Sequence, residues 1–469
     1  MVNSRAMGKV LLGALSPHPP LLVPEVGKDA LGDVEQTRQA MVRLAHAVRD
    51  VGPDVVVVIS PHGPMLPDGV GIWAIDTLEG DFGQFGAGQV GLSFPNDLEL
   101  LEALLAESES LSYTLRKVDG PLIRTYRWSP QLDYATLVPL YYLDQVGVHT
   151  PILAVGMGFL PPRDLYEFGG VLRKAIEKTG RKAVVIASGD LSHRLTCDAP
   201  AGYSPKGRIF DETLWGLLGQ GDIQGILDMD IELLKDAGEC GYRSLVMLLG
   251  CWDTEELATI PLSYEGPFGV GYGVCMMHSA KQSIPTSLAA GMECGASDFR
   301  EHPLIQLARQ TVEALARSEA LPLAVNVDLP EDLPAQAGVF VSLKKRGELR
   351  GCIGTISPTQ PNLAQEVIHV ARQASTADPR FSPVEAGELE ELSYSVDVLG
   401  SPEPVNTLHD LDPQRFGVIV EAGNRKGLLL PDLQGIDSAA QQVAIARNKG
   451  GIKPGEDVQL FRFGVRRYQ

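Results

Sequence analysis

The sequence has no apolar run long enough to cross a membrane, although 44% of its 469 residues are hydrophobic. A spanning helix needs about 20 consecutive apolar residues, so neither a membrane span nor a membrane partner is expected. Basic residues are also few: 40 Lys and Arg stand against 59 Asp and Glu, a formal net charge of −19. Such an acidic chain repels phosphate backbones, which disfavours nucleic acid as a partner.

Cysteine is scarce, with six residues and no CxxC pair. This spacing disfavours both a disulfide framework and a zinc finger. It suits a reducing compartment, and we expect a cytoplasmic protein without a signal peptide. Internal repeats and low-complexity tracts are absent from the sequence as well.

Residues 1–280 alternate between two kinds of segment. Valine-rich runs predict strands at 9–16, 54–60, 71–76, 150–158 and 182–190. Amphipathic patterns predict helices at 34–52, 98–108 and 162–180. This alternation predicts an α/β domain.

A second, smaller unit is expected after residue 299. Residues 281–299 are rich in serine, glycine and alanine, a composition typical of a linker. Beyond it, the patterns predict a helix at 302–319, a hairpin at 338–356 and a strand at 394–400. Residues 300–469 therefore form a candidate domain of their own.

Three of the nine histidines follow predicted strands of the first domain. His18 and His62 each come directly after a Ser-Pro pair, and His193 follows Gly189-Asp190 by three residues. Ligands collect beyond the carboxyl ends of parallel strands, and neutral imidazole is a common metal ligand. One such histidine is equally well explained as a turn residue, but three of them favour a shared metal site.

A divalent metal in such a site also needs a carboxylate, and Glu239 is the best candidate. It lies in Gly238–Gly241, just before an apolar helical run at 245–249. A glutamate near a helix start also interacts favourably with the helix dipole, which is the structural alternative. Two histidines and one carboxylate, with open positions opposite, are the arrangement of non-haem Fe(II) oxygenases.

Six segments within residues 9–280 carry a resemblance to a known family. They are, in order, SPHPPLLVPEVG, VVISPHGPM, SGDLSHRL, AGYSPKGRIFD, AGECGYRSLVMLLG and SYEGPFGVGYG. Together they resemble the class III (LigB-like) extradiol ring-cleavage dioxygenases and the related Memo proteins. The resemblance implies a mixed sheet between helices, with His18, His62 and Glu239 as ligands of Fe(II). Memo-type proteins have a cysteine at the third position, so Cys240 is the alternative ligand.

The resemblance also implies a mechanism. A catecholic or related metal-chelating substrate binds the iron, O₂ is the co-substrate, and His193 is the catalytic acid and base with Asp190 nearby. Tyr203, Arg243 and Tyr264 are polar candidates for binding the substrate. Each of the three is equally well explained as an ordinary surface or helix-end residue.

The second unit contains the motif ELRGCIGTI, in which two glycines flank Cys352. A cation lowers the pKa of a nearby thiol, so Arg350 is a candidate to activate Cys352. The alternative is a buried structural cysteine, which is the commoner situation.

Residues 300–469 resemble the AMMECR family, through LRGCIG, DPRFSPV, SYSVDVL and KGLLLPDL in that order. The resemblance implies an α+β domain. The two halves together resemble a fusion of proteins A and B of the AmmeMemoRadiSam system, which stand beside a radical S-adenosylmethionine enzyme. The sequence has no CxxxCxxC motif, so such an enzyme would be a separate partner. Two functions follow: an iron-dependent dioxygenase, or a component of a modification system whose metal site does other redox chemistry or serves as a scaffold.

Overall fold

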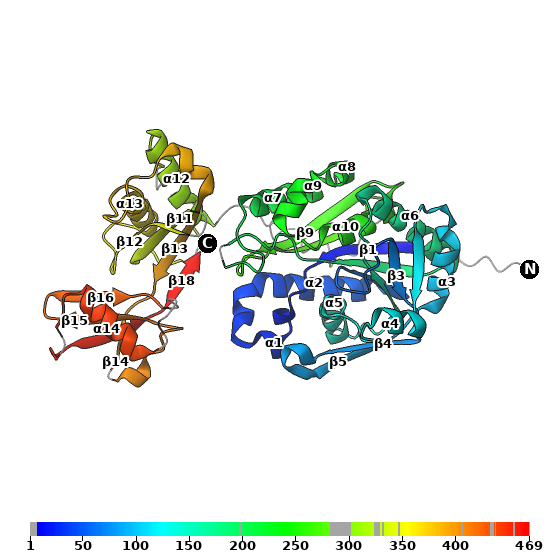
Figure 1. The fold of residues 1–469 in the computed structure, drawn as a ribbon, viewed down its shortest axis with the longest axis horizontal. Helices are drawn as coiled ribbons and strands as arrows, with labels where there is room; N and C mark the ends of the chain where they lie inside the picture. The colour runs from blue at the N-terminus through cyan, green and yellow to red at the C-terminus, as the bar shows by residue number, and fades with distance from the viewer. Residues whose placement is uncertain are drawn as a thin grey trace, which may run out of the picture. The chain divides into compact units, whose positions relative to one another are not determined.

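A computed structural model describes most of the chain. The described residues are 7–196, 198–281, 302–322, 329–330, 333–345, 348–405, 407–431, 436, 438–453 and 455–468. Two compact units, Met1–Phe299 and Arg300–Gln469, divide the chain, and each is described by itself (Figure 1). The linker expected at 281–299 lies outside the described residues except for Lys281. No helix in the described ranges combines the length and apolar character that crossing a membrane requires.

The first unit is built on one large sheet. Its strands are β1 (Lys9–Ser16), β2 (Val55–Ser60), β3 (Gly69–Trp73), β6 (Thr114–Val118), β7 (Ile152–Gly156), β8 (Lys182–Ser188), β9 (Leu257–Glu265) and β10 (Tyr272–Ser279). Their order is β6-β3-β7-β2-β8-β1-β10-β9. The four strands β7, β2, β8 and β1 are parallel, and β10 and β9 continue the sheet in antiparallel pairing. The predicted mixed sheet is thus confirmed.

Helices cover both faces of this sheet (Figure 1). On one face lie α3 (Leu98–Glu107), α6 (Pro162–Thr179), α7 (Pro205–Gln220) and α10 (Tyr242–Leu249). On the other lie α2 (Glu35–Val51), α5 (Tyr134–Gln145) and a two-stranded ribbon of β4 (Thr77–Phe82) and β5 (Ala87–Pro95), joined by the 3₁₀ turn η3 (Gly83–Phe85). The shorter helices are α1 (Pro24–Gly27), α4 (Gly120–Tyr126), α8 (Ile223–Leu227) and α9 (Ile231–Ala237).

The valine run of β2 shows why this strand has no polar face. Val55 and Val57 pack into the core on the side of α6, while Val56 and Val58 pack on the side of α2. Successive side chains of a strand point to opposite faces, so a strand covered on both sides must be apolar throughout. The pairing of β2 with its neighbouring strands then determines where the polar residues that follow it are placed.

Three adjacent strands of the sheet end level with one another. Ser16 of β1 pairs with Ser188 of β8, and Ile59 of β2 pairs with Ala187 of β8. Because these strands are parallel, the residues that follow them emerge at the same edge. This edge carries the candidate site.

The second unit contains two antiparallel sheets of four strands each. One has the order β12-β11-β13-β18 and the other β14-β17-β15-β16. The strands are β11 (Val339–Lys345), β12 (Glu348–Gly354), β13 (Leu392–Leu399), β14 (Glu403–Val405), β15 (Gly417–Ala422), β16 (Arg425–Leu429), β17 (Gln459–Phe463) and β18 (Val465–Tyr468). Helices α12 (Pro303–Arg317) and α13 (Leu363–Thr376) pack on the first sheet, and α14 (Ala439–Lys449) packs on the second. This α+β architecture agrees with the sequence-based prediction.

A candidate metal centre at the carboxyl edge of the sheet

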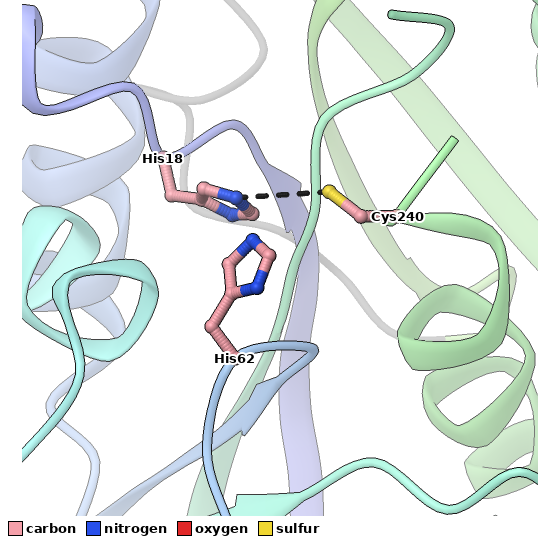
Figure 2. A group of neighbouring side chains, drawn as sticks. All are labelled: His18, His62 and Cys240. Carbon is pink, nitrogen blue, oxygen red and sulfur yellow. Dashed lines mark hydrogen bonds between the residues drawn. The ribbon is translucent and has the colours of Figure 1, made fainter. Parts of the chain in front are cut away.

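His18, His62 and Cys240 point toward one another at the ends of three different elements (Figure 2). The rings of His18 and His62 have centroids 4.9 Å apart and meet edge to face. The Cys240 Sγ lies 3.7 Å from His18 Nε2. One ligand atom from each of the three residues lies within 4.8 Å of the others, which is close enough for one metal ion to bind all three.

The hydrogen bonds of His18 fix which ring nitrogen faces this centre. Its Nδ1 lies 3.0 Å from the Ser188 Oγ, and that hydroxyl donates its only hydrogen to the Ala135 carbonyl at 2.6 Å. His18 Nδ1 must therefore carry a hydrogen and donate it to Ser188. Burial lowers the pKa of His18 well below its ordinary value, so the ring is neutral and its Nε2 lone pair faces Cys240.

The loop before α10 holds Cys240 in place through the backbone of Asp190. The N–H groups of Cys240 and Gly241 donate to the Asp190 carbonyl at 3.3 and 2.9 Å. In return, the Asp190 N–H donates to the Cys240 Sγ at 3.3 Å. The thiol is thereby fixed at the end of β8, next to the residues that follow β1.

Glu239 is not part of this cluster, so the geometry favours Cys240, the alternative, over Glu239 as the third candidate ligand. Its Oε2 accepts a hydrogen bond from the Tyr242 N–H at 2.6 Å, so the carboxylate caps α10. Its Oε1 lies 4.0 Å from the Arg243 guanidinium. Burial raises the pKa of Glu239 to about 7. Glu239 and Cys240 are adjacent in one loop but point in different directions, because the Glu239 carboxylate binds a backbone N–H at the start of α10.

Asp190 and His193 adjoin the same centre. Ligand atoms of Asp190, His193 and Cys240 also lie within 4.8 Å of one another. The Asp190 Oδ1 accepts from the His18 N–H at 2.9 Å, and its Oδ2 lies 3.8 Å from His18 Nε2. Burial raises the pKa of Asp190 to about 6. The Nδ1 of His193 is buried without a hydrogen-bond partner among the described residues, so its hydrogen-bonding capacity is unused.

Tyr134 belongs to the site but has no signal in the sequence. Its ring stacks on His62 with centroids 5.1 Å apart and meets His18 edge to face at 5.6 Å. Burial raises the pKa of its hydroxyl to about 12. The preceding Asp133 caps α5 and accepts from the Ser60 Oγ at 2.6 Å, and Ser60 accepts from the His62 N–H at 3.1 Å. A sequence shows this Asp-Tyr pair only as a helix start.

A cavity of about 380 Å³ opens beside His62. Among the described residues, its lining includes Tyr134 but not Tyr203, Arg243 or Tyr264. Tyr264 instead donates from its hydroxyl to the Asp211 Oδ2 at 2.6 Å, and Tyr203 lies in the segment before α7. The three predicted substrate-binding residues therefore do not line this cavity.

In the second-domain motif, both Arg350 and Cys352 contact acidic residues. Arg350 donates two hydrogen bonds to the Glu388 carboxylate, at 3.0 and 2.7 Å. The cation beside Cys352 is Arg380, which donates to the Cys352 carbonyl at 3.0 Å and pairs with Asp378. The Asp378 Oδ2 also accepts from the Cys352 N–H at 2.8 Å. The Arg350 guanidinium therefore binds the Glu388 carboxylate, and its activation of the Cys352 thiol stays a prediction.

Comparison with known proteins matches both units to families. Residues 12–275 match the model of the catalytic LigB subunit of aromatic ring-opening dioxygenase, and residues 305–468 match the AMMECR1 model. Protein CA_C1420 of Clostridium acetobutylicum is 38% identical over 464 residues, which cover 97% of this chain and 98% of that protein. A Thermotoga maritima protein is 45% identical over 172 residues, 36% of this chain and 98% of its own length.

Two solved structures are also similar. The uncharacterized protein PH0010 from Pyrococcus horikoshii has 30% identity and a TM-score of 0.31, covering 36% of this chain and 89% of its own. The uncharacterized protein JW3007 from Escherichia coli K12 has 18% identity and a TM-score of 0.39, covering 57% of this chain and 99% of its own. On the family matches and the near full-length relative, the chain belongs to the LigB family of aromatic ring-opening dioxygenase subunits and carries an AMMECR1 domain after its LigB domain.

Proposed function

We propose that the LigB domain is an Fe(II)-dependent oxidoreductase that acts on a small, metal-chelating aromatic substrate with O₂. The supporting observation is the convergence of His18, His62 and Cys240 at the edge of the parallel strands, with a cavity opening beside His62. In open α/β sheets this edge is where ligands bind.

The donor set fits a transition metal. Imidazole nitrogen suits iron, zinc and copper, and a thiolate suits the softer members of the series. The fixed tautomer of His18 presents a lone pair to the centre without any rearrangement. Asp190 adds a carboxylate at the same place, because its Oδ2 lies 3.8 Å from His18 Nε2.

Bound iron would supply Lewis acidity toward the hydroxyl groups of a catecholic substrate and a place for O₂ beside them. The proton that leaves such a hydroxyl needs an acceptor within reach. We assign this role to His193, whose ring adjoins Asp190 and Cys240 and whose Nδ1 has no hydrogen-bond partner in the part of the chain that the structure describes. Asp190 lies beside both His193 and Cys240 and adds a negative charge next to the imidazole. Tyr134, stacked on His62, forms an aromatic wall against which a planar ring can pack.

The test is metal content followed by O₂ consumption. The full chain, purified without oxygen and supplied with Fe(II), should retain about one iron per chain and consume O₂ with at least one member of a catechol panel. His149, which is exposed and pairs with Asp144, provides the control variant His149→Gln, which should behave like wild type. A chain that fails to retain iron, or that retains it without consuming O₂, contradicts the proposal.

A second function is favoured by the thiol and the fused domain. Carboxylate is the usual third ligand of non-haem Fe(II) oxygenases, whereas the candidate third donor here is the thiol of Cys240. The AMMECR1 domain covers residues 305–468, and ring cleavage alone gives no reason for it. Under this alternative the chain works with a separate radical S-adenosylmethionine enzyme in a modification system. Iron-loaded protein that is inert toward every catechol would favour it.

A further inference from the structure

In the described part of the chain, the cavity beside His62 is lined by acidic but not by basic side chains. Its lining residues are His62, Gly63, Pro64, Trp73, Asp81, Gln84, Trp128, Ser129, Gln131, Leu132, Asp133 and Tyr134. This set contains two carboxylates, two amides and three large aromatic side chains, but neither lysine nor arginine. A ligand that carries a carboxylate or a phosphate would find no cation in this lining. A ligand with a positive charge would find both carboxylates and aromatic faces.

The two acidic residues of the cavity are not equivalent. Both oxygens of Asp133 are occupied, because they accept from Ser60, from the Thr136 N–H and from the Thr136 hydroxyl. Asp133 therefore serves mainly to cap α5 and to position the loop of His62.

Asp81 is the carboxylate that remains for a ligand. It lies near the end of β4 and is half-buried. Its Oδ1 accepts from the Gly83 N–H at 2.6 Å, and among the described residues its Oδ2 has no partner. The ribbon of β4 and β5 thus presents one carboxylate oxygen to the cavity.

Trp128 offers a second feature that suits a cation. Its indole stacks on Tyr126 with ring centroids 4.5 Å apart and an interplanar angle of 11°. This stacking fixes the orientation of the ring at the cavity wall. Among aromatic side chains, the indole ring attracts cations most strongly.

We propose that this cavity selects substrates that carry a protonated amine, with Asp81 and Trp128 binding the ammonium group while the aromatic ring lies toward His62 and Tyr134. The orientation of the aromatic ring toward His62 rests on the proposed function. The preference of the cavity for a cation does not depend on it. That preference is therefore measurable on protein without metal and without turnover.

The test uses three phenols of similar size on the full chain after removal of metal: tyramine, 4-ethylphenol and 4-hydroxyphenylacetate. Isothermal titration calorimetry should show that tyramine binds about tenfold more tightly than 4-ethylphenol, and that the carboxylate binds most weakly. Asp81→Asn keeps the acceptor for Gly83 and should reduce the preference for tyramine by about three- to tenfold. The control Glu109→Gln removes the same charge in the turn Ser108–Ser110, away from the lining, and should leave the preference unchanged.

A gain-of-charge variant keeps the proposal testable if Asp81→Asn does not fold. Gln84→Glu adds a carboxylate to the lining and should raise the preference for tyramine. Equal affinities for the three phenols, tighter binding of the carboxylate, no binding of any of them, or an unchanged preference in the folded Asp81→Asn or Gln84→Glu protein would each overturn the proposal. Failure to consume O₂ with catechols would count against the proposed oxidoreductase and leave this preference standing.

Discussion

Gly189 and Gly241 approach so closely that a Cβ placed on Gly189 would lie 2.1 Å from the Gly241 Cα. Gly189 follows β8, and Gly241 is the N-cap of α10. Only this close packing lets the loop before α10 hydrogen-bond to the Asp190 carbonyl. The position of Cys240 beside His18 therefore depends on the absence of two side chains.

Gly189→Ala should destabilise the first unit and weaken metal binding. The added methyl group has backbone atoms as neighbours, so the loop must move, at a cost of about 1–3 kcal/mol. Thermal unfolding and metal content of the full chain would show both effects. Gly216→Ala is the matched control, because Gly216 lies within α7 with nothing inside 4 Å of its added Cβ. It should be neutral or stabilising by up to about 1 kcal/mol. Equal behaviour of the two variants would contradict the steric explanation.

Substitutions of Cys240 and Glu239 should have opposite effects on the amount of metal that the protein retains. Cys240→Ala removes a ligand atom and should lose the bound metal while the fold survives. Glu239→Gln keeps an oxygen acceptor for the Tyr242 N–H and should retain the metal. Elemental analysis of both variants after incubation with Fe(II) makes the comparison. Metal loss from Glu239→Gln with retention in Cys240→Ala would restore Glu239 as the ligand.

The different orientations of Glu239 and Cys240 show which parts of the site sequence patterns can predict. The valine runs predict β1, β2 and β8 because strands covered on both faces must be apolar. The convergence of His18 and His62 then follows from the parallel order of these strands. A loop has no such periodicity, so the sequence does not show whether Glu239 or Cys240 points toward the histidines. In the structure, the Glu239 carboxylate accepts a hydrogen bond from the first turn of α10 instead.

Tyr134 and Arg380 were missed for a related reason. Tyr134 comes after a helix-capping aspartate, and only the tertiary packing of α5 brings its ring onto His62. Arg380 lies 28 residues after Cys352, whereas Arg350 lies two residues before it. Proximity in sequence favoured Arg350 as the cation beside Cys352, but the Arg350 side chain donates two hydrogen bonds to Glu388.

His193→Gln should retain iron and lose turnover. If His193 moves the substrate proton, its loss should slow the reaction by about 10²–10⁴-fold. Metal content and O₂ consumption, measured on the same preparation, separate this role from metal binding. His278→Gln is a poor control because His278 is buried, and His149→Gln serves instead. Iron loss from His193→Gln would make His193 a ligand, and full activity would remove it from the catalytic machinery.

Glu388 should make the second unit sensitive to acid. Hydrogen bonds from Arg350 lower the pKa of Glu388 from 4.5 to about 2, although burial opposes the shift. Because the pKa is lower in the folded state, the ionised carboxylate stabilises the fold above pH 4.5, and this contribution is lost as the pH falls toward about 2.

Glu388→Gln should therefore cost about 1–3 kcal/mol at pH 7, where the Arg350 pair loses its charge partner. Differential scanning calorimetry of the two proteins from pH 7 to pH 3 should show a difference in melting temperature that shrinks below about pH 4.5. Glu403→Gln is the control, because its pair with Arg462 is exposed and worth at most about 1 kcal/mol. A difference that stays constant across this range would mean that Glu388 stabilises the sheet through its packing instead of its charge.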